Sequence, residues 1–215
     1  MKPILIFGGG GTALNVIDLI LNEQKFFKPI GYVDIKKGKP ILNVPYLGNY
    51  KVVDKLKKKF KNLYGFAAIG FGKNKDCRER RLVFNFLKKK KIKIASLISN
   101  KAFIRSNVKI LEGVLIQAGS VIDTYCTIGK NVHIGINNAI GHRVKISNHC
   151  NITGSVNIAG DLKIGEGVFL GMNSTINKSI GEWSKISAGT VCLYNVPKYT
   201  FAYTPPAKQL KIIKK

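Results

Sequence analysis

The sequence of residues 110–152, ILEGVLIQAGSVIDTYCTIGKNVHIGINNAIGHRVKISNHCNI, places an isoleucine at every sixth position. Neither the 3.6-residue period of an amphipathic helix nor the two-residue period of a strand produces this spacing. A six-residue repeat instead indicates a parallel β-helix, in which three units close one triangular coil of eighteen residues. The repeated positions are Ile104, Ile110, Ile116, Ile122, Ile128, Ile134, Ile140, Ile146, Ile152, Ile158, Ile164, Leu170 and Ile176.

Two further positions recur within each six-residue unit. A small or medium side chain stands four residues after the isoleucine, as at Ser120 and Cys126. Glycine often follows the isoleucine directly, as at Gly129 and Gly141. We expect the isoleucines to fill the interior, the smaller side chains to let the corners pack, and the glycines to relieve backbone strain at the turns. The spacing breaks near residues 177–180 and resumes two residues early at Ile180, which predicts one shortened corner there.

The first hundred residues have a different organisation. Short apolar runs, ILIF (4–7), IGYVD (30–34), YGFAAIG (64–70) and IKIASLI (92–98), alternate with stretches of helical length and pattern. Strands that alternate with helices in this way predict a small parallel sheet with helices on its faces. The sequence therefore predicts an α/β, Rossmann-like half domain over residues 1–98, followed by a parallel β-helix and C-terminal tail over residues 99–215.

The chain carries a formal net charge of +25, from 36 Lys and Arg against 11 Asp and Glu. The lysines gather in KLKKKFKN (55–62) and LKKKKIK (87–93), in or after amphipathic helices and without the interleaved aromatic residues of a single-strand binding platform. We interpret them as a solvated basic face, and secondarily as a field that attracts polyanionic cofactors. Nucleic acid is not expected as a partner.

Other classes of protein are disfavoured by what the composition lacks. No apolar run approaches the roughly 20 residues of a membrane span, and ILIF is too short for a signal-peptide core, so we expect a cytoplasmic protein. The four cysteines are scattered without a CxxC pair, so free thiols are expected and neither a disulfide framework nor a metal site is indicated.

All three histidines fall within the repeat, and none occupies an interior isoleucine position. In a coil of eighteen residues, His142 stacks between Thr124 and Gly160 at a corner, and His149 lies near another corner. His133 is placed as an outward strand residue beneath Asn151. An outward histidine is usually a surface side chain, so the pattern alone favours that reading for His142 over a catalytic one.

At this point the sequence resembles the NeuD/PglD-type sugar acyltransferases over almost its whole length. The resemblance rests on IFGGGGTA (6–13), GYVDI (31–35), AIG (68–70), NNAIGHRVKI (137–146), AGDLKIGEGVFLGMNS (159–174) and PPAK (205–208), in that order. It implies a left-handed β-helix that forms a homotrimer, binds acetyl-CoA between neighbouring prisms and holds a nucleotide-linked amino sugar on the N-terminal domain. It also implies that His142 is the general base.

The resemblance assigns further site residues by position. It implies contacts of the nucleotide sugar with Gly10, Gly11, Thr12, Asp34, Ile35 and Gly70, and of acetyl-CoA with Asn151, Gly160, Met172 and Ala188. The chain departs from the family pattern at four places. Arg143 stands where a carboxylate usually follows the histidine, and Asn151 stands where a second histidine is common. Thr12 replaces a histidine, and Thr204 replaces the glycine that precedes the C-terminal turn.

The function expected from the resemblance is N-acetylation of a nucleotide-linked amino sugar for a bacterial surface glycan such as lipopolysaccharide, capsule or glycoprotein. O-acetylation of a sialic acid-like sugar is the alternative, but an amine demands less of a base that has lost its carboxylate. A catalytically weakened trimeric scaffold is a second alternative, kept open by Arg143. GGGGTA followed by Asp34 also fits a nicotinamide dehydrogenase, although residues 1–98 leave room for only one mononucleotide-binding half. Outward apolar residues favour a trimer: Ile136, Met172 and Trp183.

Overall fold

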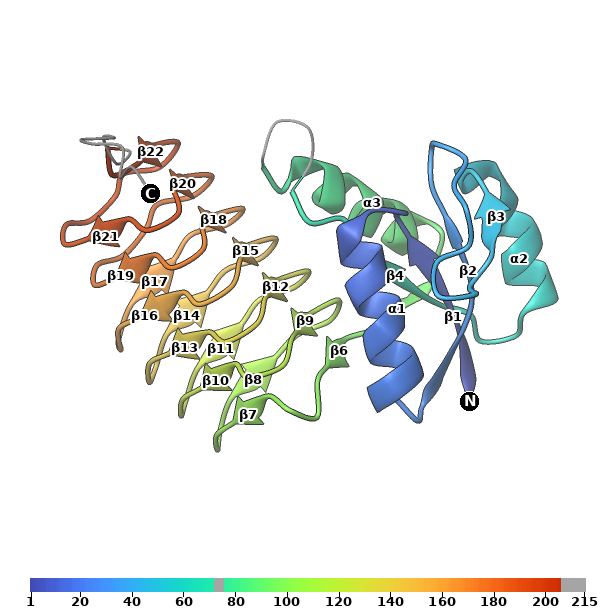
Figure 1. The fold of residues 1–215 in the computed structure, drawn as a ribbon, viewed down its shortest axis with the longest axis horizontal. Helices are drawn as coiled ribbons and strands as arrows, with labels where there is room; N and C mark the ends of the chain where they lie inside the picture. The colour runs from blue at the N-terminus through green and yellow to red at the C-terminus, as the bar shows by residue number, and fades with distance from the viewer. Residues whose placement is uncertain (72–75, 206–215) are drawn as a thin grey trace, which may run out of the picture.

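The computed structural model describes residues 1–71 and 76–205, and PPAK lies outside these residues except for Pro205. It contains an N-terminal α/β part and a prism of stacked two-residue strands that extends away from it (Figure 1). The α/β part is one parallel sheet, as predicted, and its strand order is β3-β2-β1-β4-β5. Its elements are β1 (Lys2–Phe7), α1 (Gly11–Glu23), β2 (Phe27–Val33), β3 (Tyr46–Gly48), the 3₁₀ turn η1 (Tyr50–Val52), α2 (Val53–Lys59), β4 (Tyr64–Ala67), α3 (Arg78–Lys89) and β5 (Lys93–Ile94).

The sheet is buried on both faces by helices. Ile17 and Ile20 of α1 pack with Phe66 on one face, where the cluster also includes Leu97 and Leu115 of the prism. On the other face, Val53 at the start of α2 and Leu87 of α3 belong to a second apolar cluster. Because one of the two sheet clusters includes residues of the prism, the α/β part and the prism are packed together through apolar contacts.

The prism has three faces, and each is a parallel sheet. We call the face nearest the α/β part the docked face, the second the open face and the third the lysine face. The docked face consists of β6 (Leu97–Ile98), β9 (Leu115–Ile116), β12 (His133–Ile134), β15 (Asn151–Ile152), β18 (Phe169–Leu170), β20 (Lys185–Ile186) and β22 (Phe201–Ala202). The open face consists of β7 (Phe103–Ile104), β10 (Val121–Ile122), β13 (Ala139–Ile140), β16 (Asn157–Ile158), β19 (Thr175–Ile176) and β21 (Val191–Cys192). The lysine face consists of β8 (Lys109–Ile110), β11 (Thr127–Ile128), β14 (Lys145–Ile146) and β17 (Lys163–Ile164).

The register follows the six-residue repeat. Ile134 pairs with Ile152, eighteen residues on, and the repeated isoleucines form the buried interior together with the smaller corner residues. The shortened corner is confirmed, because Ile164 bridges to Ile180, only sixteen residues on. The prism is the predicted left-handed β-helix. Its first strand is β6, so pairing within the prism starts two residues before residue 99.

The glycines that follow the isoleucines have a different structural role from the one predicted. Non-glycine residues carry the left-handed backbone conformation at successive corners, with φ of 55° at Asn137, 56° at Arg143 and 64° at Asp161. The glycines that follow the isoleucines are needed for close approach, because a Cβ at Gly141 would lie 2.6 Å from the backbone N of Gly160 in the next coil. The expectation that these glycines relieve strain at the turns was therefore wrong.

A buried arginine joins the two parts of the chain. Arg80 of α3 is fully buried, and its guanidinium donates to the backbone carbonyls of Ile69 (3.1 Å) and Gly70 (2.6 Å) in the α/β part. The same group donates to the carbonyls of His149 (3.1 Å) and Cys150 (2.8 Å) and to Oδ1 of Asn151 (2.8 Å) in the prism. This network fixes the position of the α/β part on the docked face.

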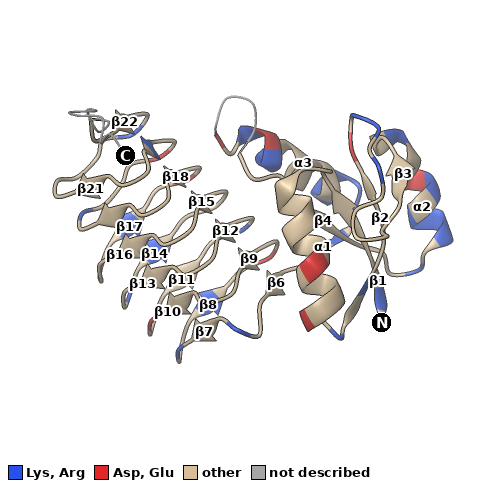
Figure 2. Cartoon of the chain, viewed as in Figure 1, with Lys and Arg blue, Asp and Glu red and all other residues tan. Residues whose placement is uncertain are grey.

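Trp183 belongs to the same internal interface. The guanidinium groups of Arg78 and Arg81 lie 5.1 Å and 4.7 Å from its ring centre, and the ring sits against Gly167. The expectation that Trp183 lies outward on a free prism face was therefore wrong, whereas Ile136 and Met172 are 48% and 53% exposed. In Figure 2 the Lys and Arg residues, in blue, are spread over several elements, including α2, α3 and the strands of the lysine face.

Candidate active site

The six positions assigned to the nucleotide sugar line one pocket of about 400 Å³. Gly10, Gly11 and Thr12 come from the loop and first turn after β1, Asp34 and Ile35 from the end of β2, and Gly70 from the segment after β4. Ligands of open parallel sheets bind at the carboxyl ends of the strands, and this pocket lies at the ends of three neighbouring strands. The structure thus brings these six residues together.

The backbone of this pocket is shaped to let a ligand approach closely. A Cβ at Gly10 or Gly11 would meet nothing within 4 Å, so both residues open directly onto the pocket. The N–H of Gly9 donates to Oδ2 of Asp34 at 2.6 Å, which ties the glycine loop to β2. Tyr50 and Glu79 also line the pocket and were not singled out from the sequence. Burial raises the pKa of Tyr50 to about 12, so its hydroxyl stays protonated.

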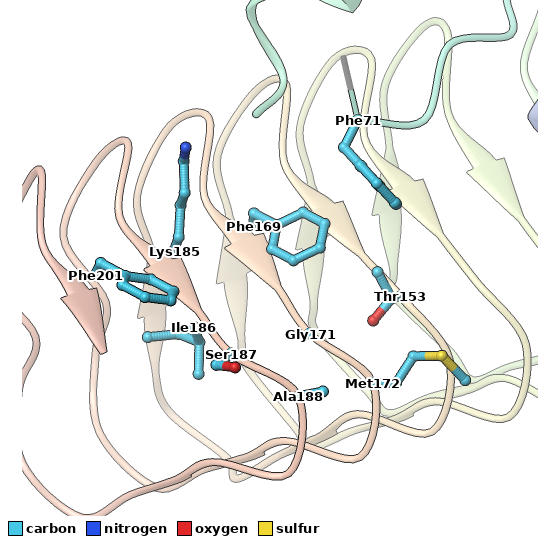
Figure 3. Close-up of a pocket in the computed structure, with 10 residues that line it drawn as sticks. All are labelled: Phe71, Thr153, Phe169, Gly171, Met172, Lys185, Ile186, Ser187, Ala188 and Phe201. Atoms are coloured by element: carbon cyan, nitrogen blue, oxygen red, sulfur yellow. The ribbon is translucent and has the colours of Figure 1, made fainter. Parts of the chain in front are cut away.

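A second pocket, of about 880 Å³, opens on the docked face (Figure 3). It contains Met172 and Ala188, two of the four positions assigned to acetyl-CoA. Its lining is mostly apolar, and Phe71 from the α/β part meets Phe169 of β18 edge-on with ring centres 5.4 Å apart. Its lining residues are Phe71, Thr153, Phe169, Gly171, Met172, Lys185, Ile186, Ser187, Ala188 and Phe201.

The other two positions assigned to acetyl-CoA lie elsewhere. Asn151 is 6% exposed in β15, and its Oδ1 already accepts a hydrogen bond from Arg80. Gly160 lies at a different corner, directly against the His142 ring: a Cβ there would be 2.5 Å from Cε1 and 2.7 Å from Nδ1. Within a single chain, therefore, the four positions do not form one site.

His142 lies at the corner between the open face and the lysine face, as the eighteen-residue stacking predicts. Its side chain is 45% exposed, but Nδ1 is buried and makes no aligned hydrogen bond. Nδ1 instead lies 3.4 Å from Oδ2 of Asp161, which belongs to the next coil. Because the side chain is 45% exposed and Nδ1 is buried, the exposed part of the ring can meet a substrate while Nδ1 faces the carboxylate.

The other two histidines are structural. His133 is 4% exposed and stacks on Phe66 with ring centres 5.4 Å apart, and burial lowers its pKa well below the usual value. His149 is 8% exposed, contacts Phe84 edge-on, and shares a 2.8 Å hydrogen bond with Asn131. Burial lowers the pKa of His149 to about 4. His133 is an outward strand residue beneath Asn151, as predicted, but it is not a surface side chain, because the α/β part covers the docked face.

The two pockets and His142 are on opposite sides of the prism in one chain. The α/β part covers the docked face, and His142 lies on the edge that the docked face does not share. The open face separates this edge from the one that carries Met172 and Ala188. A reaction that uses both pockets and His142 therefore requires a second copy of the chain.

Among residues 1–71 and 76–205, no three His, Cys, Asp or Glu side chains are grouped as ligands for a metal ion. The four cysteines are free and buried. No helix within the same residues has the length and apolar character needed to cross a bilayer.

Comparison with known proteins identifies the class. Residues 161–193 match the family model described as the hexapeptide repeat of succinyl-transferase. The whole chain is similar to PerB from Caulobacter crescentus, solved with CoA and GDP-perosamine, at 26% identity, with 97% of each chain covered and a TM-score of 0.84. A mutant of perosamine N-acetyltransferase from the same organism gives 25% identity, coverage of 97% of this chain and 96% of that chain, and a TM-score of 0.86.

A more distant solved structure has the same fold. The acetyltransferase domain of PglB from Neisseria gonorrhoeae FA1090 is 18% identical, with 97% of this chain and 99% of that chain covered and a TM-score of 0.85. No curated protein sequence matches significantly. The fold and these similarities define an acyltransferase built on hexapeptide repeats. Over almost its whole length the chain is similar in fold to sugar acyltransferases of the left-handed β-helix class.

Proposed function

We propose that the protein transfers an acetyl group from acetyl-CoA to the amine of a nucleotide-linked sugar, with His142 as general base. The observation that carries the proposal is the pairing of a glycine-lined pocket at the strand ends with a half-exposed corner histidine whose Nδ1 faces a carboxylate. The two relatives at 25–26% identity were solved with CoA and an amino-sugar nucleotide, which supports this choice of donor and acceptor.

The glycine-lined pocket suits the nucleotide part of the acceptor. A phosphate can approach Gly10 and Gly11 without a side chain in the way, and these residues lead into the N-terminus of α1, where backbone N–H groups favour an anion. Asp34 stands at the end of the next strand, at the place where an acidic side chain can bind a ribose hydroxyl. We assign the nucleotide-sugar contacts to Gly10, Gly11, Thr12, Asp34, Ile35 and Gly70.

The apolar pocket suits the pantetheine arm of the donor, because its lining beside Phe169, Met172 and Ala188 is predominantly non-polar. We keep Met172 and Ala188 as donor contacts of this copy and Gly160 as a residue of the same site supplied by a neighbouring copy. Asn151 is a weaker candidate, since its Oδ1 is occupied by Arg80. The excess of basic residues on the surface adds a field that attracts the phosphates of CoA.

The chemistry needs one base and no covalent enzyme intermediate. The sugar amine attacks the thioester carbonyl carbon, a C–N bond forms and the C–S bond breaks. Nε2 of His142 takes the proton that leaves the amine and can return it to the departing CoA thiolate. An imidazole suits this step because its protonation equilibrium lies near neutral pH.

The active site is completed by assembly into a homotrimer. The docked face is covered by the α/β part, and the lysine face carries Lys109, Lys145 and Lys163 in one column, which disfavours contact with an identical face. The open face instead presents small and apolar side chains, including Val121 and Ala139, around a groove of about 370 Å³. Packing of copies through the open face brings His142 of one copy towards the pockets of the next.

A screen with acetyl-CoA tests this function. Nucleotide-linked amino sugars should release CoA thiol and gain one acetyl group by mass spectrometry, and the N-acetylated product should resist further transfer. O-acetylation of a sialic acid-like sugar is the alternative, and transfer to hydroxyl acceptors alone would establish it. Absence of transfer to either class would leave a trimeric binding scaffold. The use of the product in cytoplasmic synthesis of a bacterial surface glycan belongs to the same proposal.

A further inference from the structure

Asp161 is the charged side chain that the structure places against the buried nitrogen of His142. Its Oδ2 lies 3.4 Å from Nδ1, and the backbone N–H of Asp161 donates to the carbonyl of His142 at 2.8 Å. The second contact belongs to the ladder between successive coils, so the relative position of the two residues is fixed by the fold. The carboxylate reaches the imidazole from the coil above rather than from the adjacent residue.

Arg143 holds this carboxylate in place. Its Nε donates to Oδ1 of Asp161 at 2.6 Å, and its Nη2 donates to Oδ2 at 2.8 Å. A bidentate arginine–carboxylate pair fixes the orientation of both groups. Hydrogen bonds from Arg143 also hold the pKa of Asp161 below its usual value, so the carboxylate is ionised at neutral pH. Arg143 thus orients an anion towards His142 instead of acting as an isolated cation beside it.

Gly160 completes the arrangement. The His142 ring lies over this glycine, where any side chain would collide with it, and Nδ1 is buried between the glycine and the carboxylate. The carboxylate beside Nδ1 favours a proton on that nitrogen, which leaves Nε2 as the unprotonated nitrogen that can accept a proton.

We propose that Asp161, held by Arg143, is the positioning residue that orients His142 and stabilises its protonated form during acyl transfer. The inference rests on the proposed function and deepens it. It assigns the role of the missing neighbouring carboxylate to a residue one coil further along the chain. Asp161 acts through His142.

The test compares Asp161→Asn with Asp54→Asn. Asn is isosteric and tolerates the left-handed backbone at position 161, where φ is 64°. Asp54 pairs with Lys90 on the α/β part, so its replacement removes the same charge from another exposed ion pair. Asp161→Asn should lower kcat about two- to fivefold, the range suited to an exposed charge pair, with little change in KM. Asp54→Asn should leave kcat unchanged, and Asp161→Glu should recover part of the loss.

A second readout does not depend on turnover. Without the anion, protonation of the imidazole becomes less favourable, so the His142 titration seen by NMR and the acid limb of the kcat profile should both move to lower pH in Asp161→Asn. The titration is assigned from the signal lost in His142→Asn. An unmoved titration in Asp161→Asn would overturn the inference. If the wild-type protein transfers no acetyl group, the proposed function fails, while the titration still decides whether Asp161 acts on His142.

Discussion

At the scale of single residues, Gly160 is the position where an added side chain would most directly displace the His142 ring. The backbone there is not in the left-handed region, so alanine is allowed by conformation, but its Cβ would lie within 2.8 Å of three ring atoms of His142. The ring is half-exposed and can move aside, so the cost should fall on its orientation rather than on folding. The position of the base thus depends on the absence of a side chain one coil away.

We therefore expect Gly160→Ala to fold with a melting temperature close to that of the wild type and to lose at least tenfold in kcat, because a misplaced base loses part of its 10²–10⁴-fold contribution, to order of magnitude. Steady-state kinetics with a parallel thermal melt measure both quantities. Gly154→Ala is the matched control, since a Cβ there finds no atom closer than 3.4 Å. Wild-type kcat in Gly160→Ala would contradict this role.

Some contacts and burial of single residues at the site were not predicted from the sequence. The eighteen-residue stacking that placed Gly160 over His142 equally places Asp161 over Arg143, so the carboxylate was within reach of the same rule. Because Arg143 stands where a carboxylate is usual, the sequence alone suggested that the histidine had lost its carboxylate partner. The burial of His133 and Asn151 could not be predicted in this way, because it depends on how the α/β part docks on the prism.

At the scale of elements, most of the fold of the prism could be predicted from the six-residue repeat. The spacing of isoleucines determines strand, corner and coil, and a two-residue slip was enough to locate the short coil at Ile180. The interface between α3 and the prism has no such period. Arg80 reaches across it to two carbonyls and one side-chain amide of the prism, and it also donates to two carbonyls of the α/β part, a pattern that requires the tertiary arrangement. A lysine-rich amphipathic helix gave no sign that one of its arginines was fully buried.

The docked face makes the fold sensitive to acid. His133 and His149 stay neutral when folded, with the pKa of His149 lowered to about 4 and that of His133 well below 6.5, but in the unfolded chain both titrate near 6.5. The unfolded state therefore binds more protons below that pH, and stability should fall as pH drops from about 6.5 towards 4. His133→Leu removes one of these two groups.

Scanning calorimetry between pH 7.5 and 5 measures this effect. Wild-type Tm should fall across the range, and His133→Leu should fall less steeply. At pH 7.5 the variant should be at least as stable as the wild type, because neither ring nitrogen of His133 has a hydrogen-bond partner. Identical slopes for the two proteins would show that His133 does not titrate on unfolding.

At the scale of the whole molecule, one chain cannot bring its own His142 to its own pockets. The prism lies between them, with the α/β part on the docked face and His142 on the opposite edge. The proposed trimer, packed through its open faces, meets this requirement, and closed rotational symmetry is the usual way in which a face of this kind is buried. Under that proposal the oligomer is a condition of activity.

We expect light scattering to give the mass of a trimer. Co-expression of two inactive variants tests the sharing of sites: His142→Asn removes the base, and Gly11→Phe fills the acceptor pocket from a position with open space around it. Mixed trimers should regain part of the wild-type activity, since some sites combine an intact histidine with an intact pocket. A monomeric mass, or mixed trimers as inactive as their parents, would refute the shared site.

The central claim is that His142 removes the proton during acetyl transfer to an amino-sugar nucleotide. Its most direct test is kcat for CoA thiol release by the wild type and by His142→Asn, with acetyl-CoA and the acceptor saturating. We expect kcat to fall roughly 10²- to 10⁴-fold, with acetyl-CoA and acceptor affinities nearly unchanged. A His142→Asn protein that turns over at the wild-type rate would contradict it.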